Sequence, residues 1–153
     1  SWKYLIKYYL KKKNYRQAKY LASKALNNNH NSIEILELIS IIYYKTKCYE
    51  DSIKFYNQIL DFKENIRWKI WKGYIKCLID AKRWSDLLKV SLKAKKQFPN
   101  KAFIDFTISG CLLKHGKLNE AIYFFQSGNK VCKVPTKLIK SFPEFTKNKT
   151  LLV

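Results

Sequence analysis

Side chains suited to catalysis are few and widely spaced along the chain. His30 and His115 are the only histidines, and neither lies beside a serine or cysteine in a recognisable nucleophile motif. The sequence contains no glycine-rich phosphate loop, no H-E-x-x-H motif and no paired-carboxylate motif. We therefore expect a protein that is not an enzyme, with no catalytic residues and no cofactor.

The cysteines do not form a metal-binding or redox motif. Cys48, Cys77, Cys111 and Cys132 are separated by 29, 34 and 21 residues, so no C-x-x-C pair exists. Free thiols are typical of proteins in a reducing compartment. The cysteine pattern thus predicts no metal site and favours a cytoplasmic location.

The chain of 153 residues is strongly basic, with 31 Lys and Arg against 11 Asp and Glu and a formal net charge of +20. Only Arg16, Arg67 and Arg83 are arginines, and lysine acts on phosphates as a point charge without the bidentate geometry that reads bases. Two interpretations stay open: a functional basic surface, or a lysine-rich composition spread over solvated helix faces. Glu34 and Glu37 interrupt the most apolar stretch, so we expect no membrane span, and their spacing predicts a solvated helical face.

An internal repeat of 34 to 35 residues runs through the chain. Small or apolar residues recur in phase, and aromatic or apolar residues precede them by three positions. The first column is Ala18, Ser52, Leu87 and Ala121, and the second is Tyr15, Tyr49, Trp84 and Leu118. Further columns are Ala25, Ile59, Ala94 and Gly128, and Tyr9, Tyr43, Leu78 and Leu112. Each unit of 34 to 35 residues is therefore expected to fold as one repeat of a repeat protein.

Within each unit the apolar spacing is helical and is interrupted once by a polar break. Asn14 precedes the second helical stripe of the first unit and is suited to cap it. Pro99 marks the end of the third unit, because proline is poorly tolerated inside a helix. The small residues Ala18, Ser52 and Ala121 are expected where the two helices of a hairpin approach closely. Such hairpins bury their apolar faces by stacking on one another.

This pattern resembles the tetratricopeptide repeat (TPR). The resemblance rests on Tyr9, Tyr15, Ala18 and Ala25 in the first unit, on Trp71, Trp84, Ala94 and Pro99 in the third, and on Gly116 to Ile122 in the fourth. It implies an all-α fold: a right-handed superhelical stack of about four TPR-like helical hairpins, an α-solenoid. The expected repeats span about 1–31, 32–66, 67–100 and 101–133. We expect the chain to be part of a longer protein or complex.

The resemblance also implies a function and a surface. First helices line the concave groove of this family, which implies a non-catalytic protein–protein interaction scaffold or adaptor. The expected peptide-binding residues are Lys3, Lys7, Lys11, Tyr44, Lys69, Lys72, Lys76, Phe103 and Phe106. Lys3, Lys7 and Lys11 form one row of lysines, here called a lysine ladder, and Lys69, Lys72 and Lys76 form a second. With the aromatic residues Phe103 and Phe106 at one end, this surface suits a protein or peptide partner that is acidic and carries a hydrophobic anchor.

An alternative function is RNA binding by a pentatricopeptide-like helical repeat, in which the lysine ladders contact phosphates. Phe106 to Gly110 resembles that family locally, but the segment from Gly110 to Gly116 is one residue too long for its turn. The alternative stays open at this point. Residues 134–153 change character, and they are expected to form a capping helix or a linker to a further segment.

Overall fold

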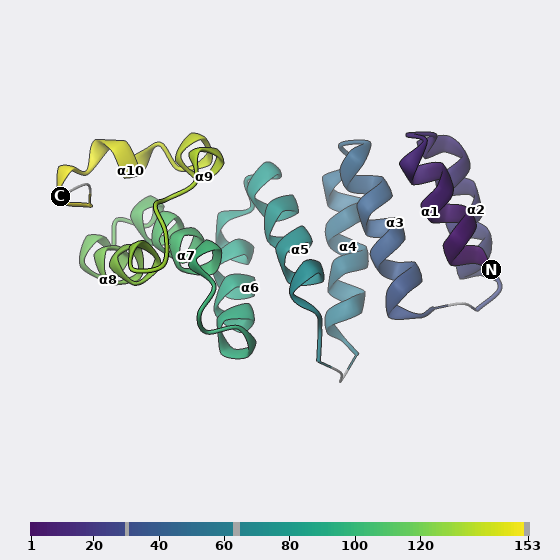
Figure 1. Cartoon of the computed structure of the whole chain (residues 1–153), viewed down its shortest axis with the longest axis horizontal. Helices are drawn as coiled ribbons and strands as arrows, with labels where there is room; N and C mark the ends of the chain where they lie inside the picture. Colours follow the sequence, from purple (N-terminus) through teal and green to yellow (C-terminus); the bar gives the residue numbers. More distant parts are fainter. Residues whose placement is uncertain (30, 63–64, 152–153) are drawn as a thin grey trace. The chain divides into compact units, whose positions relative to one another are not determined.

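The computed structural model describes residues 1–29, 31–62 and 65–151, and these form helices joined by short turns, without a strand in those ranges (Figure 1). His30, considered above for catalysis, lies outside the described residues. The helices are α1 Trp2–Lys11, α2 Tyr15–Asn27, α3 Ile33–Lys45, α4 Tyr49–Leu60, α5 Trp68–Asp80, α6 Trp84–Gln97, α7 Ala102–Lys114, α8 Leu118–Asn129, α9 Thr136–Ser141 and α10 Glu144–Lys147, with a 3-10 turn, η1, at Lys149–Leu151. The chain divides into two compact units, Ser1–Cys77 and Leu78–Val153.

The same turn closes the first helix of each hairpin. Lys13, Lys47, Lys82 and Gly116 each lie two residues after the end of a helix, with φ of 56°, 62°, 57° and 73°. After α1, Lys13 N–H donates to the Leu10 carbonyl at 3.0 Å and Asn14 N–H donates to the Tyr9 carbonyl at 2.9 Å. These two bonds are the Schellman pattern, which satisfies carbonyl groups at a helix end. The turn repeats because the sequence repeats.

Side-chain caps begin two of the helices. Asn14 Oδ1 accepts a hydrogen bond from Gln17 N–H at 3.2 Å, which confirms the cap predicted for α2. Ser32 Oγ accepts from Ile35 N–H at 3.3 Å at the start of α3. Both bonds satisfy backbone donors that have no partner inside the helix.

The first unit has its core between α1, α2 and α3. Ile6 and Ile42 are fully buried, and the small side chains of Ala18, Ala22 and Ala25 allow α2 to pack closely on its neighbours. The buried cluster comprises Ile6, Ala18, Leu21, Ala22, Ala25, Ile35, Leu38, Ile39 and Ile42. The core is therefore built from the repeat columns themselves.

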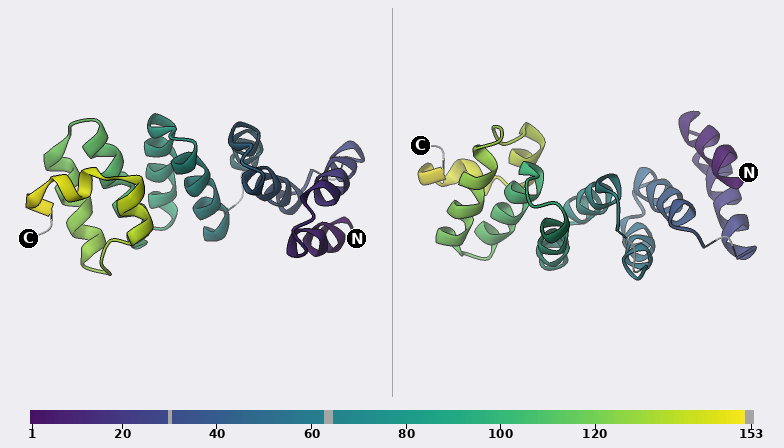
Figure 2. Two further views of the ribbon diagram at one scale, coloured as in Figure 1. Left: turned by 90° about the horizontal axis from the view of Figure 1, so that it is seen from above. Right: turned by 60° about the horizontal axis from the view of Figure 1, so that its bottom comes forward.

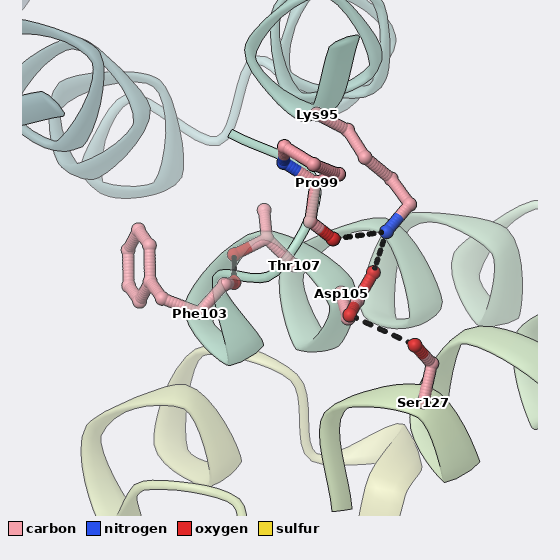
Figure 3. Close-up of polar contacts among 6 residues, drawn as sticks. All are labelled: Lys95, Pro99, Phe103, Asp105, Thr107 and Ser127. Atoms are coloured by element: carbon pink, nitrogen blue, oxygen red, sulfur yellow. Dashed lines mark hydrogen bonds and ion pairs between the residues drawn. The ribbon is translucent and has the colours of Figure 1, made fainter. Parts of the chain in front are cut away.

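Helix α7 is the most enclosed element of the second unit. Asp105 is 2% exposed and accepts hydrogen bonds from Lys95 Nζ at 2.6 Å and Ser127 Oγ at 3.0 Å, so it links α7 to α6 and α8 (Figure 3). Lys95 Nζ also donates to the Pro99 carbonyl at 3.1 Å. Beyond α8, the α9–α10 tail folds back over the α7–α8 hairpin (Figure 2). Its side chains Leu138, Phe142 and Phe145 are buried.

Candidate functional site: a lysine-walled groove between α3 and α5

A groove in the first unit is walled by α3 and α5 and has a residue of α4 in its lining. We call it the α3–α5 groove, and its volume is about 260 Å³. Its lining residues are Glu37, Ile41, Tyr44, Lys45, Tyr56, Lys69, Lys72, Gly73 and Lys76. Four of the residues expected from sequence to bind a partner are among them: Tyr44, Lys69, Lys72 and Lys76.

The α5 wall carries positive charge because of its helical spacing. Lys69, Lys72 and Lys76 are three and four residues apart and therefore lie on one face of the helix. Trp71 and Ile75 are buried, at 5% and 0% exposed. The apolar residues thus fix the rotation of α5, and this rotation leaves the lysines along the groove.

The α3 wall combines an apolar strip with one carboxylate. Ile41 and Tyr44 are half-buried, and the Tyr44 ring lies 5.8 Å from the Tyr49 ring. Glu37 is buried and accepts a hydrogen bond through Oε1 from Arg67 Nη2 at 2.9 Å. The expectation that Glu34 and Glu37 form a solvated face is therefore wrong for Glu37, because Arg67 pairs with it from 30 residues away. Glu34 is exposed as expected.

The floor of the groove depends on a glycine. A Cβ atom on Gly73 would stand 2.5 Å from Tyr56 Oη, so only glycine leaves room for this hydroxyl without a shift of one of them. The Tyr56 ring stacks on Tyr74 with centroids 5.1 Å apart, and Tyr74 Oη donates to Asn57 Oδ1. Burial, with smaller contributions from Cys77, Glu37 and Tyr44, raises the pKa of Tyr56 far above its usual value. The Tyr56 phenol therefore stays protonated at alkaline pH values where an exposed tyrosine would ionise.

The arrangement is suited to binding a negatively charged group. Four lysines (Lys45, Lys69, Lys72 and Lys76) outnumber the single carboxylate of Glu37, which is already paired with Arg67, so the groove attracts negative charge. Ile41 and Tyr44 offer apolar surface beside these cations. Within residues 1–29, 31–62 and 65–151, no group of three or more His, Cys, Asp or Glu side chains is arranged to hold a metal ion.

The other lysines predicted to bind a partner lie on α1. Lys3 is half-buried and lines a separate depression with Trp2, Ser32 and Ile35, whereas Lys7 and Lys11 are exposed. The pKa of Glu34 is lowered overall. A backbone hydrogen bond has the largest lowering effect, burial opposes it, and the charge of Lys3 lowers the pKa further. The α1 ladder therefore belongs to the first unit but does not line the α3–α5 groove.

The two phenylalanines predicted to bind a partner lie on α7 in the second unit. Phe103 is half-buried, and its carbonyl accepts a hydrogen bond from Thr107 Oγ1 at 2.7 Å (Figure 3). Phe106 is 0% exposed and packs against Phe125, with ring centroids 5.3 Å apart. Its ring also fills the space beside Gly128, where a Cβ would stand 3.0 Å from it. The prediction that Phe106 contacts a partner is wrong, because Gly128 admits its ring into the core.

Sequence reasoning missed Tyr56 and Gly73 as groove residues. Gly73 had a detectable signal, since it is one of only four glycines in the chain and lies in the interior of a predicted helix. Tyr56 had none, because it lies on a second helix and reaches the groove only where Gly73 leaves space.

Comparison with known proteins identifies proteins of similar fold among solved structures. No protein-family model and no curated protein sequence matches the chain. Among solved structures, YrrB, described as a TPR protein with an unusual peptide-binding site, superposes with a TM-score of 0.76 at 13% identity, covering 96% of this chain and 77% of YrrB. MamA from Desulfovibrio magneticus RS-1 gives a TM-score of 0.76 at 14% identity, covering 99% of this chain and 93% of that MamA chain. MamA AMB-1 gives a TM-score of 0.74 at 16% identity, covering 95% of this chain and 80% of the MamA AMB-1 chain.

These similarities agree with the repeat columns, the four equivalent turns and the helix order described above. In the described part of the chain, no helix combines the length and apolar character needed to cross a bilayer. The chain is an all-α helical repeat with the fold of the tetratricopeptide-repeat proteins.

Proposed function

We propose that the protein is a non-catalytic interaction scaffold whose α3–α5 groove binds an acidic segment of a partner protein. The observation that carries this proposal is the convergence of Tyr44, Lys69, Lys72 and Lys76 on one groove. The fold supports it, since YrrB, which shares the fold, is described as having a peptide-binding site.

The groove chemistry indicates the kind of segment that fits. Its volume of about 260 Å³ is smaller than the roughly 300–1,000 Å³ of typical small-molecule pockets, which suits one anchoring side chain. That side chain would pack on Ile41 and Tyr44. Carboxylates on either side of the anchor would pair with the α5 lysines, and these exposed pairs add selectivity and association rate more than affinity.

The remaining predicted residues extend this proposal. Lys3, Lys7 and Lys11 form a second ladder on α1 that would contact acidic residues of the same or another partner. Phe103 is retained as a proposed contact of the second unit, and Phe106 is dropped because it is buried. We also propose a cytoplasmic protein, since Cys48, Cys77, Cys111 and Cys132 are all free thiols.

A peptide array probed with the full chain at about 150 mM salt tests the proposal. Enrichment of peptides with several Asp or Glu around one aromatic or aliphatic residue supports it. Enrichment of neutral or basic peptides contradicts it. Single-stranded RNA is tested in parallel. RNA binding that collapses between low and moderate salt, with no selective peptide, would favour the nucleic-acid alternative instead.

A further inference from the structure

The tail of the second unit lies on α7 in the way a bound segment would. Phe142 and Phe145 are both fully buried, and Pro143 and Glu144 stand between them. The Phe142 ring lies 5.3 Å from the Trp84 ring and 5.7 Å from the Phe145 ring, measured between centroids. The short sequence Phe-Pro-Glu-Phe therefore places two aromatic anchors and one carboxylate on the helix.

A glycine on α7 leaves the space that the Phe142 ring occupies. We call the surface that receives Phe142 and Glu144 the seat of the tail. A Cβ on Gly110 would stand 2.5 Å from ring atoms Cδ1 and Cγ of Phe142. Any side chain at this position would push the ring away, since real Cβ atoms do not approach so closely. Gly110 thus leaves room for Phe142 of the tail, as Gly73 leaves room for Tyr56 in the first unit.

A lysine on α7 holds the carboxylate. Lys114 Nζ donates to Glu144 Oε1 at 2.8 Å and lies 4.3 Å from the centre of the Trp84 ring. Burial alone would raise the pKa of Glu144, but the bond from Lys114 and other hydrogen bonds and charges lower it overall. Glu144 Oε2 is buried and has no hydrogen-bond partner among the described residues. Glu144 thus uses one of its two carboxylate oxygens in the pair with Lys114.

The seat corresponds to the surface predicted for partner binding. Gly110 and Lys114 stand three repeat intervals after Lys7 and Lys11, at the same positions of a first helix. Beside the seat, an open depression of about 350 Å³ is lined by Lys82, Arg83, Trp84, Ser85, Asp86, Lys114 and His115, and Arg83 Nη2 pairs there with Asp86 Oδ2 at 2.8 Å. Lys114 therefore lines this depression and at the same time holds Glu144 of the tail.

We propose that Trp84, Gly110 and Lys114 form a second recognition site, occupied by the chain's own Phe142–Pro143–Glu144 and open to a partner segment that carries an aromatic residue two positions before a carboxylate. The partner binds by displacing the tail. The apparent affinity of the intact chain is therefore lower than that of the released site, by the fraction of molecules in which the tail is detached. This site shares no residue with the α3–α5 groove, and its test is independent of that proposal.

The test compares full-length variants for binding of a fluorescent peptide with the sequence of residues 136–149. Phe142→Ala/Glu144→Ala removes the anchor and the carboxylate and should bind the peptide at least about tenfold more tightly than the unmodified chain. Lys137→Ala/Lys140→Ala changes two exposed residues of the same tail and should bind like the unmodified chain. In the released variant, Lys114→Glu should abolish binding, and a peptide with lysine in place of the Glu144 equivalent should restore it.

Equal binding by the released variant and the unmodified chain would overturn the proposal, as would indifference to the Lys114→Glu change. Circular dichroism and urea unfolding check that the released variant is folded. Should it unfold, Glu144→Lys alone, which keeps both aromatic rings, replaces it in the same comparison. Failure of Glu144→Lys to bind the peptide more tightly than the unmodified chain would then refute the site.

Discussion

Ser52 Oγ on α4 donates a 2.8 Å hydrogen bond to the carbonyl oxygen of Ser40 on α3. In the α7–α8 hairpin the hydroxyl is on the opposite helix, since Ser109 Oγ on α7 donates at 2.7 Å to the Ala121 carbonyl on α8. Both bonds are buried and lie at the same pair of repeat positions. A serine on either helix of a hairpin is thus small enough for the two helices to approach closely, and its hydroxyl supplies the hydrogen bond that joins them.

Removing the Ser52 hydroxyl should weaken the α3–α4 hairpin. We expect Ser52→Ala to lower the free energy of unfolding by about 1 kcal/mol, which is typical of a single buried hydrogen bond. Ser52→Val should cost more, about 1–3 kcal/mol, because the residue is fully buried between helices. Urea unfolding measures both changes. A valine variant as stable as the serine protein would show that the helices are not in close contact here.

The left-handed turns predict opposite effects for two matched substitutions. Gly116 has φ of 73°, and a Cβ atom added there would have no neighbour within 4 Å, so Gly116→Ala should cost about 1 kcal/mol through the backbone alone. Lys47 has φ of 62°, and Lys47→Gly should be neutral or stabilising by up to about 1 kcal/mol. Thermal unfolding of the two variants provides the comparison. Destabilisation by both would contradict a shared turn geometry.

The floor of the α3–α5 groove can be tested with a double-mutant cycle. Gly73→Ala alone should destabilise the protein, because the added Cβ meets Tyr56 Oη at 2.5 Å. Tyr56→Phe removes that oxygen, so Gly73→Ala should be tolerated better in the Tyr56→Phe background, with a coupling of about 0.5–3 kcal/mol. Urea unfolding of the four proteins gives the coupling. Strictly additive effects would mean that these two residues do not touch.

Thiol labelling tests the burial of the cysteines. Burial raises the pKa of the Cys111 thiol to about 12, and the nearby charge of Lys114 only partly opposes this. A thiol whose pKa lies far above the labelling pH carries almost no reactive thiolate, whereas an ordinary exposed thiol, with a pKa of about 8.5, is partly ionised at pH 8. At pH 8 in the folded protein, Cys48 and Cys132 should react and the buried Cys77 and Cys111 should react only after unfolding. Mass spectrometry of labelled peptides reads out each site, and rapid labelling of Cys111 would contradict the packing of α7.

Much of the fold could be predicted because its determinants are local and repeated. The small residues Ala18 and Ser52, the cap at Asn14 and the helical apolar spacing each act within one hairpin. The division into four repeats and a tail at residue 133 stays a prediction.

The site was only partly predictable because some of its determinants are distant in sequence. Lys69, Lys72 and Lys76 could be placed on one face from spacing alone. The burial of Glu37 depends on Arg67, 30 residues away, and the burial of Phe106 depends on the absence of a side chain at Gly128. No periodicity in the sequence contains that information.

The most direct test of the account is the affinity of an acidic peptide, selected on the array, for groove and control variants of the full chain. Lys72→Glu/Lys76→Glu reverses two charges in the α3–α5 groove, and Lys24→Glu/Lys54→Glu reverses two exposed charges outside it. Fluorescence anisotropy should show binding weakened by about tenfold or more in the groove variant and by less than about twofold in the control. Equal weakening in both variants would show that the peptide responds only to net charge, and the α3–α5 groove would then not be the binding site.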